Sequence, residues 1–359
     1  MIIVRPDAYR QYMTGRKRFV LILEEQFMDS FEIEHGTRYE QYTKVTAEPG
    51  RPLADILSRE VREGSDVLVI AEDDLLLTAP AVAIGPERTV ATLRAGTGPL
   101  ALNQVSALLE ALEKTDPDAV RQGADTLTAA LNAAGGLTLD DPLTGSLAKL
   151  TYAHPTWSWT DTGVFQPGVV QAAPAGRHRL SADGVGTVIT GQIAVKGWPV
   201  VRSRTPGTVQ SRKLFEQLTA LSHYPLVLTV EDGTVSDLRA AEAGSAKAAV
   251  ALEQLFTADP GHSRVAGLEF GLNNAVPLLP FNSESNATGT GKATTSVHLV
   301  LGSLPATPLQ VVLPCSISTL TALDSTTPLA GAGTAAQGEG STRPRRRMNR
   351  VTSAGCGCH

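Results

Sequence analysis

Apolar and polar positions follow two different patterns along the chain, and the change between them lies near residue 145. In the first part, continuous apolar runs such as RFVLILEE (18–25) and SDVLVIAEDD (65–74) are typical of strands buried on both faces of a parallel sheet. LADILSREVREG (53–64) and LNQVSALLEALEKT (102–115) instead repeat apolar residues three or four positions apart, which predicts amphipathic helices. This part is therefore predicted to form an α/β layer.

A different pattern begins after AAGGLTLDDPLTG (133–145), a segment rich in Gly, Pro and Asp. From there, many short strand-like runs are separated by turns that contain Gly or Pro. We therefore predict a two-domain α/β fold, with an N-terminal α/β domain over residues 1–145 and a second domain over residues 146–323.

Large apolar residues become rare after residue 323. The segment DSTTPLAGAGTAAQGEGSTRP (324–344) consists mainly of small and polar residues, whose burial cannot offset the entropy lost on ordering them. This composition predicts a flexible linker. The linker leads to RRRMNRVTSAGCGCH (345–359), a basic tail with two cysteines.

Charge is unevenly distributed between the body and the tail. The 359-residue chain has a formal net charge of −5, although the tail region contributes a cluster of arginines. Nucleic-acid binding needs a basic face on a folded surface, so an acidic body argues against a nucleic-acid partner. No apolar run approaches the roughly 20 residues of a membrane span, and no secretory signal is visible. We therefore expect a cytoplasmic protein.

The three cysteines are too few and too clustered to predict a disulfide framework. Cys315 lies in the apolar stretch VVLPCSI and is predicted to be a small core residue. Cys356 and Cys358 stand between glycines near the C-terminus, where their thiols would be open to modification.

Four segments of the second domain carry a family resemblance. They are PGVVQAAP (167–174), YPLVLTVEDGTVSDL (224–238), VAGLEFGLNN (265–274) and GTGKATTSVHLVLGS (289–303). In this order they resemble segments of the thermophilic metalloaminopeptidases, the aminopeptidase T and aminopeptidase S group. The resemblance implies an aminopeptidase-like fold and a homodimer.

Members of that family are exopeptidases in which two glutamates, two histidines and an aspartate hold two metal ions, assisted by a tyrosine. The resemblance places one glutamate on Glu269 and one histidine on His298. The other expected positions carry different residues: Val169, Pro308 and Gln310 for the remaining ligands, and Pro305 for the tyrosine. A catalytic zinc usually has three protein ligands, so we expect an inactive homologue that needs no cofactor.

Two interpretations of the remaining polar residues stay open. Glu269 and His298 could hydrogen-bond each other or backbone groups inside the old cleft, or could still hold a metal ion. A replacement site could use His154, His178 and Asp183, although histidines near arginines are more often solvated surface groups.

The body, linker and tail together favour a precursor of a ribosomally made, modified peptide. In this hypothesis the aminopeptidase-like body is a folded leader, and its partners are peptide-modifying enzymes and a processing protease. The modification would fall on Cys356 and Cys358, with Thr352 and Ser353 as further candidates, and cleavage would follow Arg347 or Arg350. The alternatives are a peptide-binding pseudoenzyme, a protein that handles zinc or copper with its Cys-Gly-Cys-His end, and an active aminopeptidase.

Overall fold

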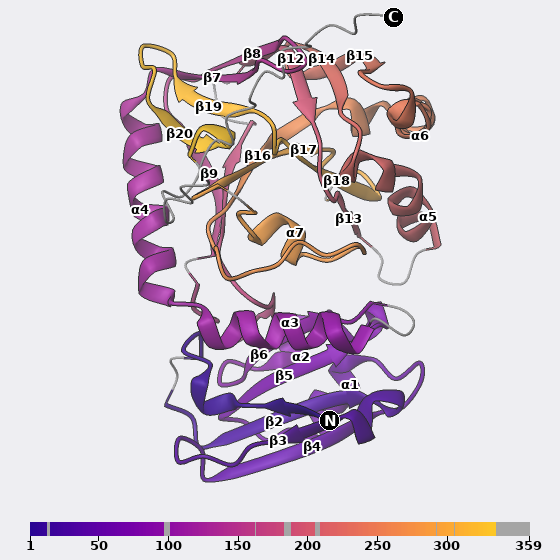
Figure 1. Ribbon diagram of the computed structural model, residues 1–359. Coiled ribbons are helices and arrows are strands. Elements are labelled where there is room, and N and C mark those ends of the chain that lie inside the picture. The colour runs from indigo at the N-terminus through magenta and orange to yellow at the C-terminus, as the bar shows by residue number, and fades with distance from the viewer. Residues whose placement is uncertain are drawn as a thin grey trace, which may run out of the picture.

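The structure is a computed structural model that describes most of the chain. The described residues are 1–12, 15–96, 101–161, 163–182, 188–204, 209–291, 293–304 and 306–334, with the side chains of 157–161 set aside. Figure 1 shows a parallel sheet at one end, antiparallel sheets at the other, and helix α3 lying between them. No helix in these ranges has the length and apolar character needed to cross a membrane.

The N-terminal part is built on a five-stranded parallel sheet with strand order β10-β6-β5-β2-β4. Its strands are β2 (Arg18–Glu24), β4 (Gln41–Ala47), β5 (Ser65–Ala71), β6 (Thr89–Arg94) and β10 (Val170–Ala172). Both apolar runs expected to be strands are therefore confirmed, as β2 and β5. All seven residues of β5 are buried, which explains why its sequence is apolar without alternation.

Helices cover both faces of this sheet. On one face, α1 (Leu53–Glu60) and α2 (Ala81–Ile84) pack against β2, β5 and β6. On the other face lies α3 (Ala101–Lys114), so both predicted helices are confirmed. A short parallel pair of β1 (Ile2–Val4) and β3 (Phe31–Ile33) adds to the α3 side. Between the two ends runs α4 (Pro117–Ala133), whose N-terminus is capped by the Asp116 carboxylate.

The C-terminal part packs two antiparallel sheets against each other. The six-stranded sheet has the order β13-β18-β17-β16-β11-β9 and the seven-stranded sheet the order β15-β14-β12-β8-β7-β19-β20. The bounds of the first are β9 (Thr156–Asp161), β11 (Arg177–Ser181), β13 (Val200–Ser203), β16 (Val265–Gly271), β17 (Ser296–Leu301) and β18 (Leu309–Pro314). Those of the second are β7 (Gly136–Asp141), β8 (Ser146–Thr151), β12 (Val188–Val195), β14 (Leu226–Glu231), β15 (Thr234–Ala240), β19 (Thr319–Ala322) and β20 (Pro328–Gly331).

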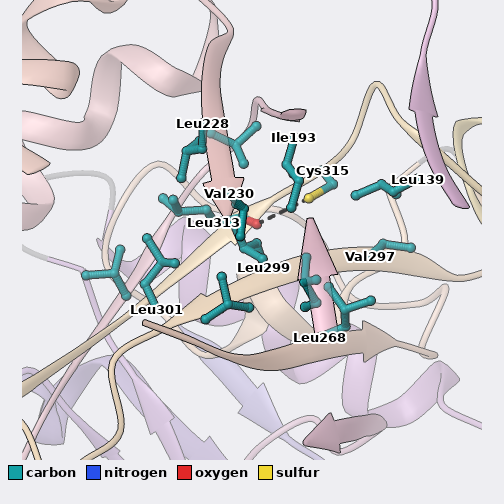
Figure 2. Packing of buried hydrophobic residues seen from close by; sticks show 14 of the residues in the cluster. Leu139, Ile193, Leu228, Val230, Leu268, Val297, Leu299, Leu301, Leu313 and Cys315 are labelled. Carbon is teal, nitrogen blue, oxygen red and sulfur yellow. Dashed lines mark hydrogen bonds between the residues drawn. The ribbon is translucent and has the colours of Figure 1, made fainter. Parts of the chain in front are cut away.

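Side chains from both sheets meet in one apolar core, which also includes α4, α5 (Val209–Leu218) and α6 (Ala246–Ala258). Figure 2 shows Leu268, Leu299 and Leu313 of the six-stranded sheet near Leu228 of the other sheet. Cys315 lies among them and is fully buried, which confirms its predicted core position. Burial raises the pKa of its thiol to about 12, so it stays protonated at neutral pH.

The change between the two sheet types does not coincide with the expected boundary at residue 145. β7 and β8 form a hairpin on either side of that residue, and both belong to the seven-stranded sheet. Conversely, β10 comes from the second part of the sequence but pairs in parallel with β6 of the first part. Each half of the sequence therefore contributes a strand to the sheet of the other half. A cut at residue 145 would not separate the core of the parallel sheet from the core of the antiparallel sheets.

Part of the segment predicted to be a flexible linker is ordered. Residues 324–334 contain β20, which pairs with β19, and a short 3-10 helix, Ala332–Thr334. Ala330 is fully buried and Leu329 packs against the main core. The prediction was wrong here because a short edge strand is held by backbone hydrogen bonds and needs few large side chains. The rest of the predicted linker and the tail lie outside the described residues.

Gly267 allows β11 and β16 to approach closely, and its replacement by alanine should destabilise the fold. Its φ is +152°, and a Cβ there would lie 2.1 Å from the carbonyl oxygen of Leu180. We expect Gly267→Ala to cost about 2–4 kcal/mol of unfolding free energy, measured by urea denaturation. Gly123→Ala is the matched control. It lies in helix α4 with no atom within 4 Å of the added methyl, and should gain about 0.5–1 kcal/mol. Equal stability of the two variants would contradict this account.

Candidate functional site

Glu269 and His298 lie side by side on the polar face of the six-stranded sheet. They are direct partners in the antiparallel pairing of β16 with β17, so their side chains point to the same face. The neighbours of Glu269 in β16, Leu268 and Phe270, point the other way into the main core. Helix α7 (Ser285–Thr288) packs over the polar face, and both side chains are only 2% exposed.

The partner of the Glu269 carboxylate is an arginine. Arg202 donates from Nη1 to one Glu269 oxygen at 2.6 Å and from Nη2 to the other at 2.9 Å. A second arginine, Arg179 on β11, lies 3.9 Å from the same carboxylate. The expected hydrogen bond between the Glu269 and His298 side chains is not among the contacts of the described residues, and a bidentate ion pair takes its place.

Every N–H group of the Arg202 guanidinium has an acceptor. Besides its two bonds to Glu269, Arg202 donates from Nε and Nη2 to the Glu284 carboxylate at 2.8–3.2 Å. The fifth donor, on Nη1, contacts the amide oxygen of Gln310 at 3.0 Å, because Arg202 and Gln310 are paired residues of β13 and β18. Arg177 also binds Glu284. Two carboxylates and two guanidiniums thus balance each other in the interior. We call Arg202, Glu269, Glu284 and Gln310 the Arg202 cluster.

Opposing effects set the charges in the cluster. Burial alone would raise the pKa of Glu269, but the charge and hydrogen bonds of Arg202 hold it below its usual value. Glu284 behaves in the same way, since Arg202 and Arg177 lower its pKa against the effect of burial. Burial would lower the pKa of Arg202, and the two glutamates raise it well above its usual value. All three groups are therefore charged at neutral pH.

His298 remains neutral beside this cluster. Burial lowers its pKa from 6.5 to about 4; the charge of Glu269 and a hydrogen bond with the Glu269 backbone oppose this shift, and the positive charge of Arg202 adds to it. Its Nδ1 atom is buried and has no hydrogen-bond partner among the described residues. A neutral imidazole with an orphaned nitrogen would suit a metal ligand, so the surrounding residues decide whether a metal ion fits.

The other positions taken from the family resemblance do not complete a metal site. Val169 is 44% exposed in the loop before β10, and Pro308 precedes β18 and has no donor atom in its side chain. Gln310 donates to the Gly302 carbonyl at 3.0 Å and accepts from Arg202, so both ends of its amide are engaged. Pro305 lies outside the described residues.

The two described histidines of the proposed replacement site, His154 and His178, have different surroundings. His178 is buried, faces away from the cluster and contacts the hydroxyl of Thr128 on α4 at 2.9 Å. His154 is exposed in the loop before β9, and Asp183 lies outside the described residues. Within the described ranges, no three His, Cys, Asp or Glu side chains are arranged to hold a metal ion.

The residues around Glu269 therefore do not fit the divalent ions that the fold family implies. A metal ion needs free carboxylate oxygens, whereas both oxygens of Glu269 are bound by Arg202. A guanidinium also places a full positive charge at the point where such an ion would have to sit. The cation at this site is an arginine of the chain itself.

An acidic cleft adjoins the smaller cavity that reaches the Arg202 cluster. A volume of about 1040 Å³ opens at the carboxyl ends of β2, β4, β5 and β6, where ligands bind in many open α/β sheets. Carboxylates dominate its described lining: Glu24, Glu25, Glu48, Glu72, Asp73, Asp74 and Glu216, against Arg94 and Arg212. A smaller cavity of about 270 Å³ shares Asp74, Arg94, Ser211 and Asn282 with this cleft and reaches Arg202 and Glu284.

Sequence reasoning missed Arg202, Glu284 and Arg177. One signal was available for Arg202: it directly follows two apolar residues in VVRS (200–203), and its partner Gln310 lies within the apolar run LQVVLP (309–314). Glu284 lies in a loop, where no helical or strand periodicity predicts which way its side chain points. The tail residues Thr352, Ser353, Cys356, Cys358, Arg347 and Arg350 lie outside the described residues.

The fold and this site define a mixed α/β protein in which a five-stranded parallel sheet is joined to two antiparallel sheets. Among solved structures, it is similar to 2,5-dihydroxypyridine dioxygenase from Pseudomonas putida KT2440, with a TM-score of 0.55. The match covers 93% of this chain and 95% of the other, at 11% sequence identity, and therefore shows a shared aminopeptidase-like fold. No family model matches the chain. No curated protein matches it either.

The buried His298 should make stability depend on pH in a defined window. Its folded-state pKa of about 4 lies below the unfolded value of 6.5, so the unfolded chain binds the proton first. The unfolding free energy should thus fall by about 1 kcal/mol per pH unit as the pH drops through this interval. In His298→Gln the loss between pH 6.5 and 5 should be much smaller, because only the carboxylates then contribute and they do so mainly below pH 5, whereas His154→Gln, at an exposed histidine, should keep it. Urea denaturation at pH 7, 6, 5 and 4.5 measures the slopes; identical slopes for native protein and His298→Gln would refute the assignment.

Proposed function

We propose that this protein is a non-hydrolytic aminopeptidase-like scaffold that presents its own C-terminal peptide for modification. The observation that carries the proposal is the Arg202 cluster. An arginine binds the one glutamate retained from the family's ligand set, and the nearby glutamine is bound to the same arginine. A site arranged in this way does not offer the open metal positions that peptide hydrolysis by this family would need.

The described body ends at Thr334, beside the edge strand β20, and 25 residues follow it. They include the two cysteines flanked by glycine and the arginines at 345–347 and 350. Small neighbours leave Cys356 and Cys358 sterically open to a modifying enzyme, and Arg347 or Arg350 would suit a protease that releases the product. This reading makes the body a folded leader and the tail its substrate.

Intact-mass analysis tests the proposal. When the protein is produced together with the enzymes encoded beside its gene, we expect a mass change confined to a C-terminal fragment with Cys356 and Cys358. The double variant Cys356→Ala and Cys358→Ala should abolish that change. Cys315→Ala, at the buried cysteine, is the matched control and should keep it. An unmodified tail under these conditions would count against the precursor function.

Peptide binding in the acidic cleft is a second candidate function. The excess of carboxylates in the described lining favours a cationic peptide, and the basic segment RRRMNR (345–350) of this chain has that character. Glu72 lines this cleft, and burial and the nearby Glu24 raise the pKa of its carboxyl. A cationic ligand would relieve that repulsion.

Binding of a synthetic RRRMNR peptide to a protein shortened after residue 334 should be measurable by calorimetry and should weaken as salt is added. Glu48→Gln plus Glu72→Gln should weaken it about three- to tenfold, since each surface charge pair contributes roughly 0.2–1 kcal/mol. Glu253→Gln, on the exposed side of α6, should leave it unchanged. Equal affinity in all three proteins would exclude the cleft.

A further inference from the structure

The acceptors around Arg202 come from three elements other than the strand that carries it. Glu269 is on β16, Gln310 is on β18, and Glu284 precedes α7. Each acceptor also has a partner of its own: Arg177 binds Glu284, Gln310 donates to the Gly302 carbonyl, and Arg179 lies near Glu269. These contacts would hold the acceptor oxygens in place even if the Arg202 side chain were shorter.

The geometry of these oxygens selects the class of cation. Five oxygens, two from each carboxylate and one from Gln310, surround the guanidinium at 2.6–3.2 Å from its nitrogen atoms. These distances and the fork of parallel donors match a planar guanidinium. Divalent metal ions require oxygens at about 2.0–2.6 Å, and a compact ammonium has only three donors.

The acceptor oxygens would also be accessible from solvent if the Arg202 side chain were shortened. Arg202 and Glu284 both line the cavity of about 270 Å³, together with Ser203 and Leu304. This cavity shares lining residues with the open acidic cleft. A small cation could therefore diffuse through the cleft to the acceptors.

We propose that Glu269, Glu284 and Gln310 form a guanidinium-binding site, which the native chain fills with its own Arg202. A free guanidinium compound enters this site when the Arg202 side chain is removed. This proposal concerns the group bound by Glu269, Glu284 and Gln310 and does not involve the C-terminal tail. It can therefore be tested separately from the proposed function.

Chemical rescue of Arg202→Ala tests this site. Thermal unfolding of the full chain is followed with increasing millimolar methylguanidinium chloride, and with methylammonium chloride at the same ionic strength. We expect a midpoint well below that of the native protein, raised by a few degrees when methylguanidinium exceeds its Kd about tenfold. Methylammonium should raise it much less, and the native protein should respond to neither compound.

Two further measurements keep the test decisive. Arg202→Ala combined with Glu269→Gln should lose the response to methylguanidinium, because one of its two carboxylates is neutral. If Arg202→Ala is insoluble, its refolding yield from urea should at least double with methylguanidinium. Unchanged midpoint and unchanged yield would overturn the proposal. It would also be overturned if calcium or zinc ions stabilised Arg202→Ala while methylguanidinium did not.

Discussion

A largely buried guanidinium helps to connect the two ends of this molecule, together with the pairing of β10 with β6. Arg202 binds Glu284, and the segment before Glu284 reaches into the N-terminal part: Leu279 is buried in the core formed by the parallel sheet and α3. Asn282 in the same segment exchanges two hydrogen bonds with the backbone of Val201, next to Arg202. Without this guanidinium, Glu269 would keep only the more distant Arg179 and Glu284 only Arg177, and an incompletely balanced buried charge costs several kcal/mol. The arginine therefore stabilises the link between β13 and the segment that carries Leu279 and Glu284.

The same arrangement shows how this scaffold balances converging carboxylates. Either a bound cation or an arginine of the chain can neutralise such charges. Here Glu269 on β16 is balanced by Arg202 on β13, although β17 and β18 lie between these two strands. The structural similarity to a dioxygenase, another protein of this fold, shows that the scaffold is not tied to peptide hydrolysis. The chemistry that such a fold supports depends on the side chains that it presents at its site, here on the polar face of the six-stranded sheet.

Much of the architecture could be predicted from the sequence, because buried parallel strands and amphipathic helices leave periodic signals that depend on nearby residues only. The register that places Glu269 opposite His298 joins segments of moderate separation, and both residues were expected in one site. Arg202 was not, since its burial depends on pairing with Gln310, 108 positions later, and an arginine near a strand end usually faces solvent. The strand β20 was missed for a related reason: its stability comes from the neighbouring β19 and is not encoded in the composition of residues 328–331.

The pairing of β10 with β6 has a consequence for biosynthesis. Residues 170–172 complete the edge of a sheet whose other strands have all been translated by residue 94, and Leu279 fills the same core still later. In a nascent chain, the apolar parallel sheet therefore stays incomplete while roughly half of the polypeptide is synthesised. Domains usually fold as units during translation. Because the parallel sheet needs residues from the second half of the chain, its core is completed late, and the interval in which a chaperone would be needed is longer.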